Sequence, residues 1–464
     1  MNRKAWEKYI LTVGLTVLIL MTNSCKITQP YRVPADATNN KLYRDAFITD
    51  TTNIANISWK QMFTDTLLQS MVQEGINNNL DLKIAVARIK GATANVKQSK
   101  LQLLPAFDAT ATATYQEVPS TVFGFPQAYL LEVTSSWEAD VWGKLSSAKK
   151  AALASLLQSE AYKKAVQTQL VSDIVTNYYL LMAYDEQLRV TEKTVVNRER
   201  EVETMKILKE SNVVTGAAVV QSSANLYSVK ITIPDLKQNI HDTENVISLL
   251  LGRTPDSIFR TSLEQQNITT NLATGVPAQL LANRPDVQEA EYQLRNSFEL
   301  VNVARTYFYP SFTITAAAGV SNTTIEQLFN PVSFFANITG GLLQPIFDQG
   351  RNKQRLATAQ ATQEEYLNTF KKTILSAGQE VSNALYSYQS ALQKQSLREQ
   401  QIIYLQKSVD YTKQLLEYSS ATNYTDVLTS EQSLLAAQLS SINDKLQQLN
   451  AVVNLYRSLG GGWK

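Results

Sequence analysis

The residue types that most often carry out chemistry are scarce in this chain of 464 residues. It contains one histidine, His241, and one cysteine, Cys25. His241 stands beside Asp242 without the further ligands that a metal site needs, so the pattern favours a solvent-exposed histidine and no metal site. The sequence has no glycine loop followed by Lys-Ser or Lys-Thr, and no nucleophile elbow. We therefore expect neither enzyme activity nor a cofactor.

Cys25 is the residue for which the sequence predicts a modification. Residues 1–24 have a basic start and an apolar run from position 10 to 21 that is too short to span a bilayer. We predict a signal peptide over 1–24 that is removed, and Cys25 directly after it as the lipid-attachment site of a bacterial lipoprotein. Thr22 departs from that pattern, because leucine is more usual there. The alternative is an incidental thiol.

Charge and composition exclude several classes of protein. Removing residues 1–24 leaves 40 basic and 40 acidic residues, so the mature chain has no electrostatic footprint for nucleic acid. With Cys25 acylated, the mature monomer has no cysteine left for a disulfide. Only 16 glycines and 12 prolines interrupt the chain, which favours long helices over a loop-rich fold.

The chain repeats its landmarks about 207 residues apart. Separations of 205, 207 and 208 residues recur in the same order, which indicates duplication of a whole structural unit rather than a solenoid repeat of about 20–50 residues. The paired landmarks are Pro105 and Pro310, Gly143 and Gly350, and Leu251-Gly252 and Leu459-Gly460.

Each copy contains two runs in which apolar and polar residues alternate. The clearest run covers 107–116, where Phe, Ala and Tyr alternate with Asp, Thr and Gln, and a partner run precedes Trp137. The second copy repeats the pattern, so we predict hairpins at about 105–138 and about 310–347. A lipid-exposed barrel strand requires such alternation, although a half-buried soluble sheet alternates in the same way. Aromatic residues flank the runs, as at a membrane interface: Tyr115, Tyr129, Trp137, Tyr307, Phe308 and Tyr309.

Four strands cannot close a pore, because a barrel needs about eight or more strands in total. The barrel interpretation therefore requires an oligomer, and three copies would supply twelve strands.

Each hairpin leads into a helix far longer than a globular core needs. Residues 144–211 and 351–420 contain almost no glycine or proline, and nearly 70 residues at about 1.5 Å each predict rods of roughly 100 Å. Return helices at about 217–251 and 424–459 make each half an antiparallel pair, with a kink expected at Pro234. We interpret one charged stretch of the first rod as solvated; it contains Glu199, Glu201, Glu203, Lys206 and Lys209.

These features divide the chain into successive segments. We predict a lipid anchor and extended linker at 25–58, a first repeat at 59–255 and a second repeat at 284–464. An equatorial linker at 256–283 joins the repeats. Within them, the long helix pairs cover about 144–251 and about 351–459.

Several motifs resemble one family in their order and spacing, over nearly the whole length from Trp59. They are WKQMF at 59–63 with NLDL at 79–82, SWEADVWGK at 136–144, GVP at 275–277, LANRPD at 281–286 with Ala290-Glu291, FYPSF at 308–312, PIFDQGR at 345–351 and LGGGW at 459–463. Together they resemble the TolC-like outer-membrane efflux proteins, specifically the lipidated outer-membrane factors of tripartite, RND-type multidrug pumps. The chain departs from the family pattern at Asn283, Ala218 and Ala421.

The resemblance implies a mainly helical fold with a membrane β-barrel. A homotrimer would build a twelve-stranded β-barrel continued by a twelve-helix α-barrel, lipid-anchored in the bacterial outer membrane and extending into the periplasm. It would conduct drugs or other small solutes passively, from a periplasmic adaptor and an inner-membrane transporter to the exterior. Outer-membrane lipid is a further expected partner.

The resemblance also maps a gate onto the periplasmic tip, at about 211–222 and 420–432. Asp426 and Glu431, tripled by symmetry, are the candidates for an acidic constriction, and Tyr424 for a steric one. The alternative is that they are exposed hairpin residues without a gating role.

Two other functions fit the same pattern: a conduit for type I protein secretion, and a lipid-anchored periplasmic coiled-coil structural protein. Metal-ion efflux is less favoured, because the six methionines do not cluster.

Overall fold

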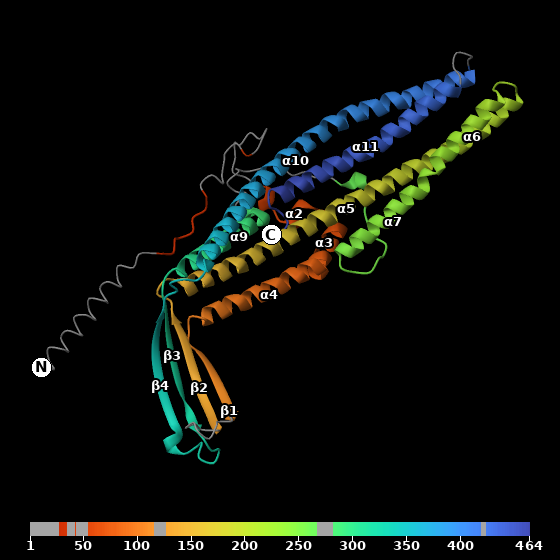
Figure 1. Ribbon diagram of the computed structural model, residues 1–464. Coiled ribbons are helices and arrows are strands. Elements are labelled where there is room, and N and C mark those ends of the chain that lie inside the picture. The colour runs from red at the N-terminus through yellow and green to blue at the C-terminus, as the bar shows by residue number, and fades with distance from the viewer. Residues whose placement is uncertain (1–26, 35–41, 43–53, 116–126, 267–281, 419–423) are drawn as a thin grey trace. The chain divides into compact units, whose positions relative to one another are not determined.

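A computed structural model describes residues 27–34, 42, 54–115, 127–266, 282–418 and 424–464 (Figure 1). The predicted signal peptide and Cys25 lie outside the described residues, as does Ala421.

Helices dominate the described chain, and its strands come in two consecutive pairs. The first half contains η2 (Ile54–Asn56), α2 (Trp59–Met62), α3 (Thr66–Asn78), α4 (Leu80–Leu101), β1 (Ala106–Tyr115), β2 (Gln127–Ala139), α5 (Lys144–Glu210), α6 (Gly216–Lys230) and α7 (Thr232–Leu250). The second half contains η3 (Leu263–Gln265), α9 (Pro285–Thr306), β3 (Ser311–Asn322), η4 (Pro331–Ser333), β4 (Phe334–Leu343), α10 (Arg351–Tyr418) and α11 (Tyr424–Ser458).

The four strands form one antiparallel sheet in the order β1-β2-β3-β4 (Figure 1). The two predicted hairpins are present, and β2 pairs with β3 to join them across the repeats. Opposed residues of antiparallel strands share a face. Ser136 is opposite Ala106 and Thr315, and Thr315 is opposite Thr339, so the alternation continues across all four strands. The sheet therefore has one threonine-rich face and one apolar face, as predicted from the alternating runs.

The two long helices also agree with the predicted rods. Helix α5 has 67 residues and α10 has 68, or about 100 Å each at about 1.5 Å per residue. Helix α11 returns along α10: Arg398 bonds Asp444 at 2.9 Å, and Ser408 lies 3.1 Å from the Ser430 hydroxyl. From the first contact to the second, the residue number increases on α10 and decreases on α11, so the two helices are antiparallel.

The return half of the first pair is broken between α6 and α7 at Ile231. Pro234 is the third residue of α7, and its ring clashes with the carbonyl four residues back, at Lys230. The helix is therefore interrupted near the predicted position, three residues before the proline.

Glycines occupy the two corners at which a strand gives way to a long helix. Gly143 has φ of 78° and Gly350 has φ of 80°, a left-handed conformation that other residues adopt only with strain. Asp140 and Asp348 cap the two helices: Asp140 accepts from the amide of Leu145 at 2.8 Å, and Asp348 from that of Asn352 at 2.8 Å. The glycine corners inferred from the sequence are thus confirmed.

A second pair of corners repeats at the ends of the return helices. Gly252 and Gly460 also have positive φ, and a Cβ on either would meet a backbone oxygen, at Asn78 and Asn283 respectively. Beside them, Asn79 donates to the carbonyl of Leu250 at 3.0 Å and Arg284 donates to that of Ser458 at 2.9 Å. The same corner is thus built twice, as duplication requires.

Contacts group the chain into two compact units, and each repeat contributes to both. One unit contains the sheet and the helix ends beside it, in residues 89–158 and 290–370 together with the segment up to Pro34. The other contains 35–88, 159–289 and 371–464, which include the far parts of the long helices and their return helices.

Candidate functional site

The three candidate gate residues lie on the first turns of α11, but they do not share one face. Positions 424 and 431 are seven residues apart and lie on the same stripe of the helix, whereas 426 projects to the other side. Asp426 is exposed in the first turn, where an acidic side chain suits the helix dipole. The structure therefore brings Tyr424 and Glu431 together and sets Asp426 apart.

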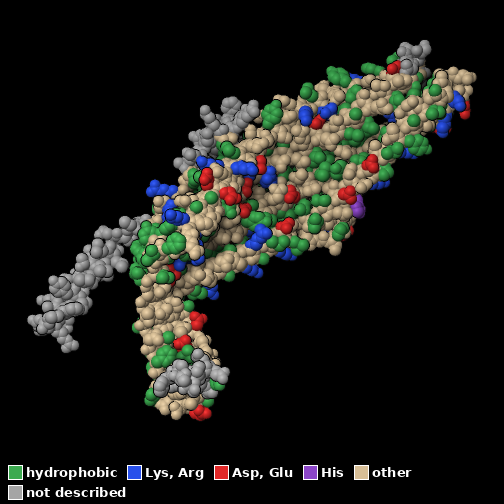
Figure 2. Space-filling view, in the orientation of Figure 1, with side chains coloured by type: hydrophobic (Ala, Val, Ile, Leu, Met, Phe, Trp, Pro, Cys, Tyr) green, Lys and Arg blue, Asp and Glu red, His purple; other side chains and the backbone are tan. Residues whose placement is uncertain are grey.

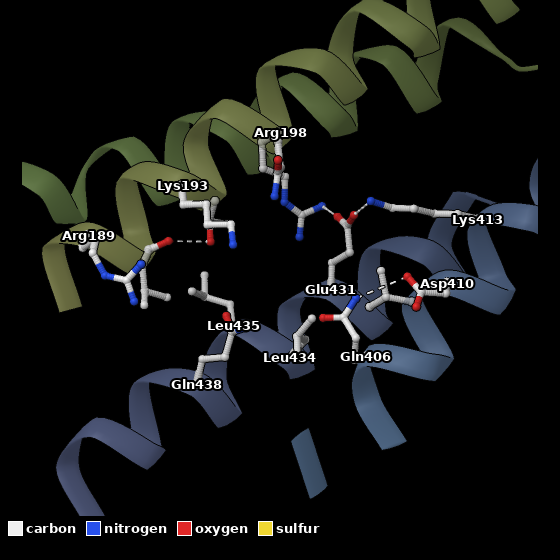
Figure 3. Close-up of a pocket in the computed structure, with 14 residues that line it drawn as sticks. Arg189, Lys193, Arg198, Gln406, Asp410, Lys413, Glu431, Leu434, Leu435 and Gln438 are labelled. Atoms are coloured by element: carbon white, nitrogen blue, oxygen red, sulfur yellow. Dashed lines mark hydrogen bonds and ion pairs between the residues drawn. The ribbon is translucent and has the colours of Figure 1, made fainter. Parts of the chain in front are cut away.

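Glu431 joins three helices through ion pairs (Figure 3). Its carboxylate contacts the guanidinium of Arg198 on α5 and lies 2.5 Å from the ammonium of Lys413 on α10. Arg198 also pairs with Glu201, one turn along α5, at 3.0 Å. Two acidic and two basic side chains thus form one network between α5, α10 and α11.

Most of this network is shielded from water. The Arg198 side chain is 2% exposed, Glu201 10% and Glu431 12%, whereas Lys413 is 49% exposed. Removing one partner of a buried pair costs about 3–5 kcal/mol, because an uncompensated charge remains. The pair of Glu431 with Lys413 resembles an exposed ion pair, which contributes about 0–1 kcal/mol. Arg198 is therefore the cation on which the network depends.

Glu201 has the most perturbed carboxyl group of this site. Burial, followed by the nearby negative charge of Glu431, raises the pKa of Glu201 to about 7, against the lowering effect of Arg198. Its Oε1 atom is buried and has no hydrogen-bond partner in the described part of the chain. The neutral form of Glu201 is thus well populated near neutral pH.

Tyr424 packs among the helices instead of standing free. Its side chain is 6% exposed and belongs to an apolar cluster with Met205 of α5 and Leu428 of α11. Partly buried apolar residues complete the cluster, namely Leu208, Val214, Ala218, Val219 and Leu416. Burial raises the pKa of the Tyr424 hydroxyl, which therefore stays neutral.

A cavity of about 310 Å³ lies beside the network (Figure 3). Its walls carry four basic residues, Arg189, Lys193, Arg198 and Lys413, and two acids, Asp410 and Glu431. Leu434 and Leu435 of α11 supply apolar lining. The cavity means that the three helices are not packed tightly together next to the ion network.

Sequence reasoning missed Arg198, Glu201 and Lys413. It assigned Glu201 to a solvated stretch, which is wrong, because its carboxyl is buried while Glu203 and Lys206 are 64% and 55% exposed. The available signal was helical spacing. Positions 198 and 201 follow the stripe of buried Val195, Val202 and Met205 on the packed face of α5.

Other candidate chemistry gives no site in the described residues. The His241 side chain is 73% exposed and lies 3.8 Å from Asp242, which confirms its predicted exposure. Within the described ranges, no group of three or more His, Cys, Asp or Glu residues is arranged to hold a metal ion. No helix in the described part combines the length and apolar character needed to cross a membrane.

A family model described as outer membrane efflux protein matches residues 71–253 and 276–461. These two segments follow the two repeats and cover most of the chain.

Relatives of similar length have diverse names. The chain is 27% identical over 462 residues to the probable outer membrane lipoprotein SilC of Salmonella typhimurium, covering 97% of this chain and 98% of that protein. It is 26% identical over 454 residues to the cation efflux system protein CusC of Escherichia coli, covering 96% and 97%. It is 28% identical over 418 residues to the pyoverdine export outer membrane protein OpmQ of Pseudomonas aeruginosa, covering 88% and 87%.

Solved structures share the fold. The outer-membrane channel OprN superposes with a TM-score of 0.85 at 23% identity, covering 95% of this chain and all of that one. The open state of the MtrE outer membrane channel of Neisseria gonorrhoeae gives 0.85 at 21% identity, covering 95% and 99%. At such identities the likeness carries the fold alone.

Proposed function

The chain belongs to the outer membrane efflux protein family, and from this premise we propose that three copies form the exit channel of a tripartite efflux pump. The observation that carries this proposal is the four-stranded sheet with its two unlike faces and two open edges. Family membership favours a channel over the alternative of a lipid-anchored coiled-coil spacer.

The sheet has the dimensions and the edges of one part of a barrel. The ten residues of β1 extend about 34 Å, and a tilt of about 40° reduces this to about 26 Å, close to the apolar band of outer-membrane barrels. Edge strands β1 and β4 end the sheet, and Phe107 and Ile338 are 71% and 76% exposed. Backbone groups in hydrocarbon must be paired, so β1 of one copy would pair with β4 of the next. Three copies would then close twelve strands.

Export in one direction needs an energy source, which partner proteins would supply. The sequence contains no nucleotide-binding motif, so the energy for export would come from an inner-membrane transporter, linked through a periplasmic adaptor. The relatives are named for cations, pyoverdine and toluene, and these names do not agree on one solute. We therefore propose small solutes as the cargo.

For gating, we propose different roles for the three candidate residues. Glu431 would act as a latch inside each subunit, since it ties α11 to α5 and α10 through Arg198 and Lys413. Tyr424 would hold the same helices together through its apolar packing. Asp426, exposed on the other side of α11, is the candidate for a ring of three acids at the constriction.

The proposal can be tested with purified protein and with cells. Detergent-extracted protein should be trimeric and should conduct ions in planar bilayers, whereas a structural spacer would not conduct. A deletion strain should gain sensitivity to drugs, bile salts or metals, and wild-type protein should reverse it. Loss of a secreted protein without altered sensitivity would support the type I secretion alternative.

A further inference from the structure

Charge is sharply segregated in the unit that contains the sheet. The two segments that carry the strands, residues 105–143 and 310–350, contain seven acids and no lysine or arginine. The acids are Asp108, Glu117, Glu132, Glu138, Asp140, Glu326 and Asp348. On the face drawn in Figure 2, red but no blue side chains lie over the strands, and blue ones begin along the helices.

Bases begin where the strands give way to helices. Residues 144–159 and 351–363 contain six bases and no acid, and no acid lies between 82 and 107. Six of the bases around these junctions form what we call the basic belt: Lys97 and Lys100 at the end of α4, Lys149 and Lys150 near the start of α5, and Arg351 and Lys353 at the start of α10.

The helix dipole does not account for the basic belt. A base near the C-terminus of a helix is favourable, which fits Lys100 on α4. A base in the first turn is unfavourable, yet Arg351 and Lys353 occupy the first turn of α10, which has no acid. Helix ends of opposite polarity therefore carry the same charge, and a common anionic neighbour explains both.

The basic belt is available to such a neighbour. Five of its six residues are exposed, and Lys149 is half-buried. None of the six has an ion-pair partner among the described residues. Lys144 and Arg355 lie outside this set because they are used internally: Lys144 pairs with Glu138 at 3.0 Å, and Arg355 lies 3.8 Å from the ring of Tyr307.

The N-terminal segment lies beside one of the same junctions between strand and helix. Thr28 lies against Gly143, at the corner between β2 and α5, and Gln29 exchanges hydrogen bonds of 3.1 and 3.0 Å with Asn302 of α9. Cys25 precedes Thr28 by three residues, a reach of about 10 Å. Acyl chains on the predicted attachment site would therefore enter the bilayer near the belt.

We propose that the basic belt binds the phosphate groups of glycerophospholipids in the leaflet nearest the helices, with a preference for anionic headgroups. This rests on the proposed function, in that the sheet spans the membrane. The apolar face of the strands contacts the acyl chains, and lysine and arginine side chains reach back to the phosphates. Each base near an anionic surface strengthens binding about fivefold at moderate salt.

The test compares two triple variants with the same change in charge. Lys100, Lys150 and Lys353 are replaced by Gln in the belt variant. In the control, exposed lysines outside the belt, Lys83, Lys206 and Lys237, are replaced by Gln. Trimers are taken from vesicles of phosphatidylcholine and phosphatidylglycerol, and the lipid retained on each is counted by native mass spectrometry.

We expect wild type and control to retain phosphatidylglycerol preferentially, and the belt variant to lose at least tenfold of that preference. High salt should reduce the preference of wild type. Equal retention by the two variants would overturn the proposal, and so would displacement of phosphatidylglycerol by added lipid A. Bilayer conductance of the same preparations separates the two ideas: a preparation that conducts but shows no lipid preference refutes only the belt, and one that never conducts refutes the channel.

Discussion

Arg198 and Lys413 both pair with Glu431, yet their removal should have very different effects. Arg198→Gln removes the buried cation shared by Glu201 and Glu431 and leaves them with only the half-exposed Lys413. The cost is about 3 kcal/mol or more, because an unpaired buried charge is expensive. Lys413→Gln breaks a half-exposed pair that contributes about 0–1 kcal/mol. If this energy holds the tip closed, the closed-to-open equilibrium shifts by roughly 150-fold in the first variant and by about fivefold at most in the second.

Single-channel recording in planar bilayers measures this difference directly, with open probability as the readout. Leakage of a large antibiotic into cells expressing each variant provides a second readout. Circular dichroism and trimer content should match wild type in both variants, which excludes global misfolding. Equal open probabilities for Arg198→Gln and Lys413→Gln would refute the latch, since both substitutions remove one positive charge next to Glu431.

Three further predictions concern charge, pH and backbone. Neutralising Asp426 and Glu431 together should raise conductance or antibiotic leakage, and unchanged values for both would remove them from the gate. In the packed helices the pKa of Glu201 is about 7, against an ordinary value of 4.5. Protonated Glu201 therefore stabilises the packed state fully below about pH 4.5, and this stabilisation is lost as the pH rises through 7. Open probability should therefore rise between pH 5 and 8, and Glu201→Gln should flatten that dependence; a slope unchanged by the substitution would show that another group titrates. Gly460→Ala should lower the thermal unfolding temperature more than Gly350→Ala, because both glycines have positive φ but only a Cβ at 460 meets a backbone oxygen. A comparable lowering of the unfolding temperature in both variants would mean that backbone strain causes the loss and that the contact with the backbone oxygen does not.

Much of the fold could be predicted because local patterns determine it. Alternation over 107–116 exposes a period of two that only a strand satisfies. The nearly glycine-free and proline-free stretches after Gly143 and Gly350 leave no place for a helix to end. Both glycines have a positive φ, which explains why a glycine recurs at each corner between a strand and a long helix.

Long-range pairing could not be predicted in the same way. The sequence indicated two hairpins, but the register of β2 with β3 depends on contacts between segments almost 200 residues apart. The ion network around Glu431 also depends on long-range contacts, because Glu431 pairs with Arg198 on another helix, 233 positions away. Glu201 looked solvated among neighbouring charges, and only the packing of α5 against other helices buries it. Local composition carries no information on such partners.

The most direct test of the channel is the environment of two neighbouring residues in β1, Ala111 and Thr112. Ala111 lies on the apolar face opposite Leu131, and Thr112 on the threonine-rich face. Single cysteines at these positions, in trimers reconstituted into vesicles, can be probed with a water-soluble thiol reagent and with a lipid-dissolved quencher. The barrel predicts that position 112 reacts from water and that position 111 contacts lipid. Equal reaction of both positions with the water-soluble reagent would contradict a membrane-spanning barrel.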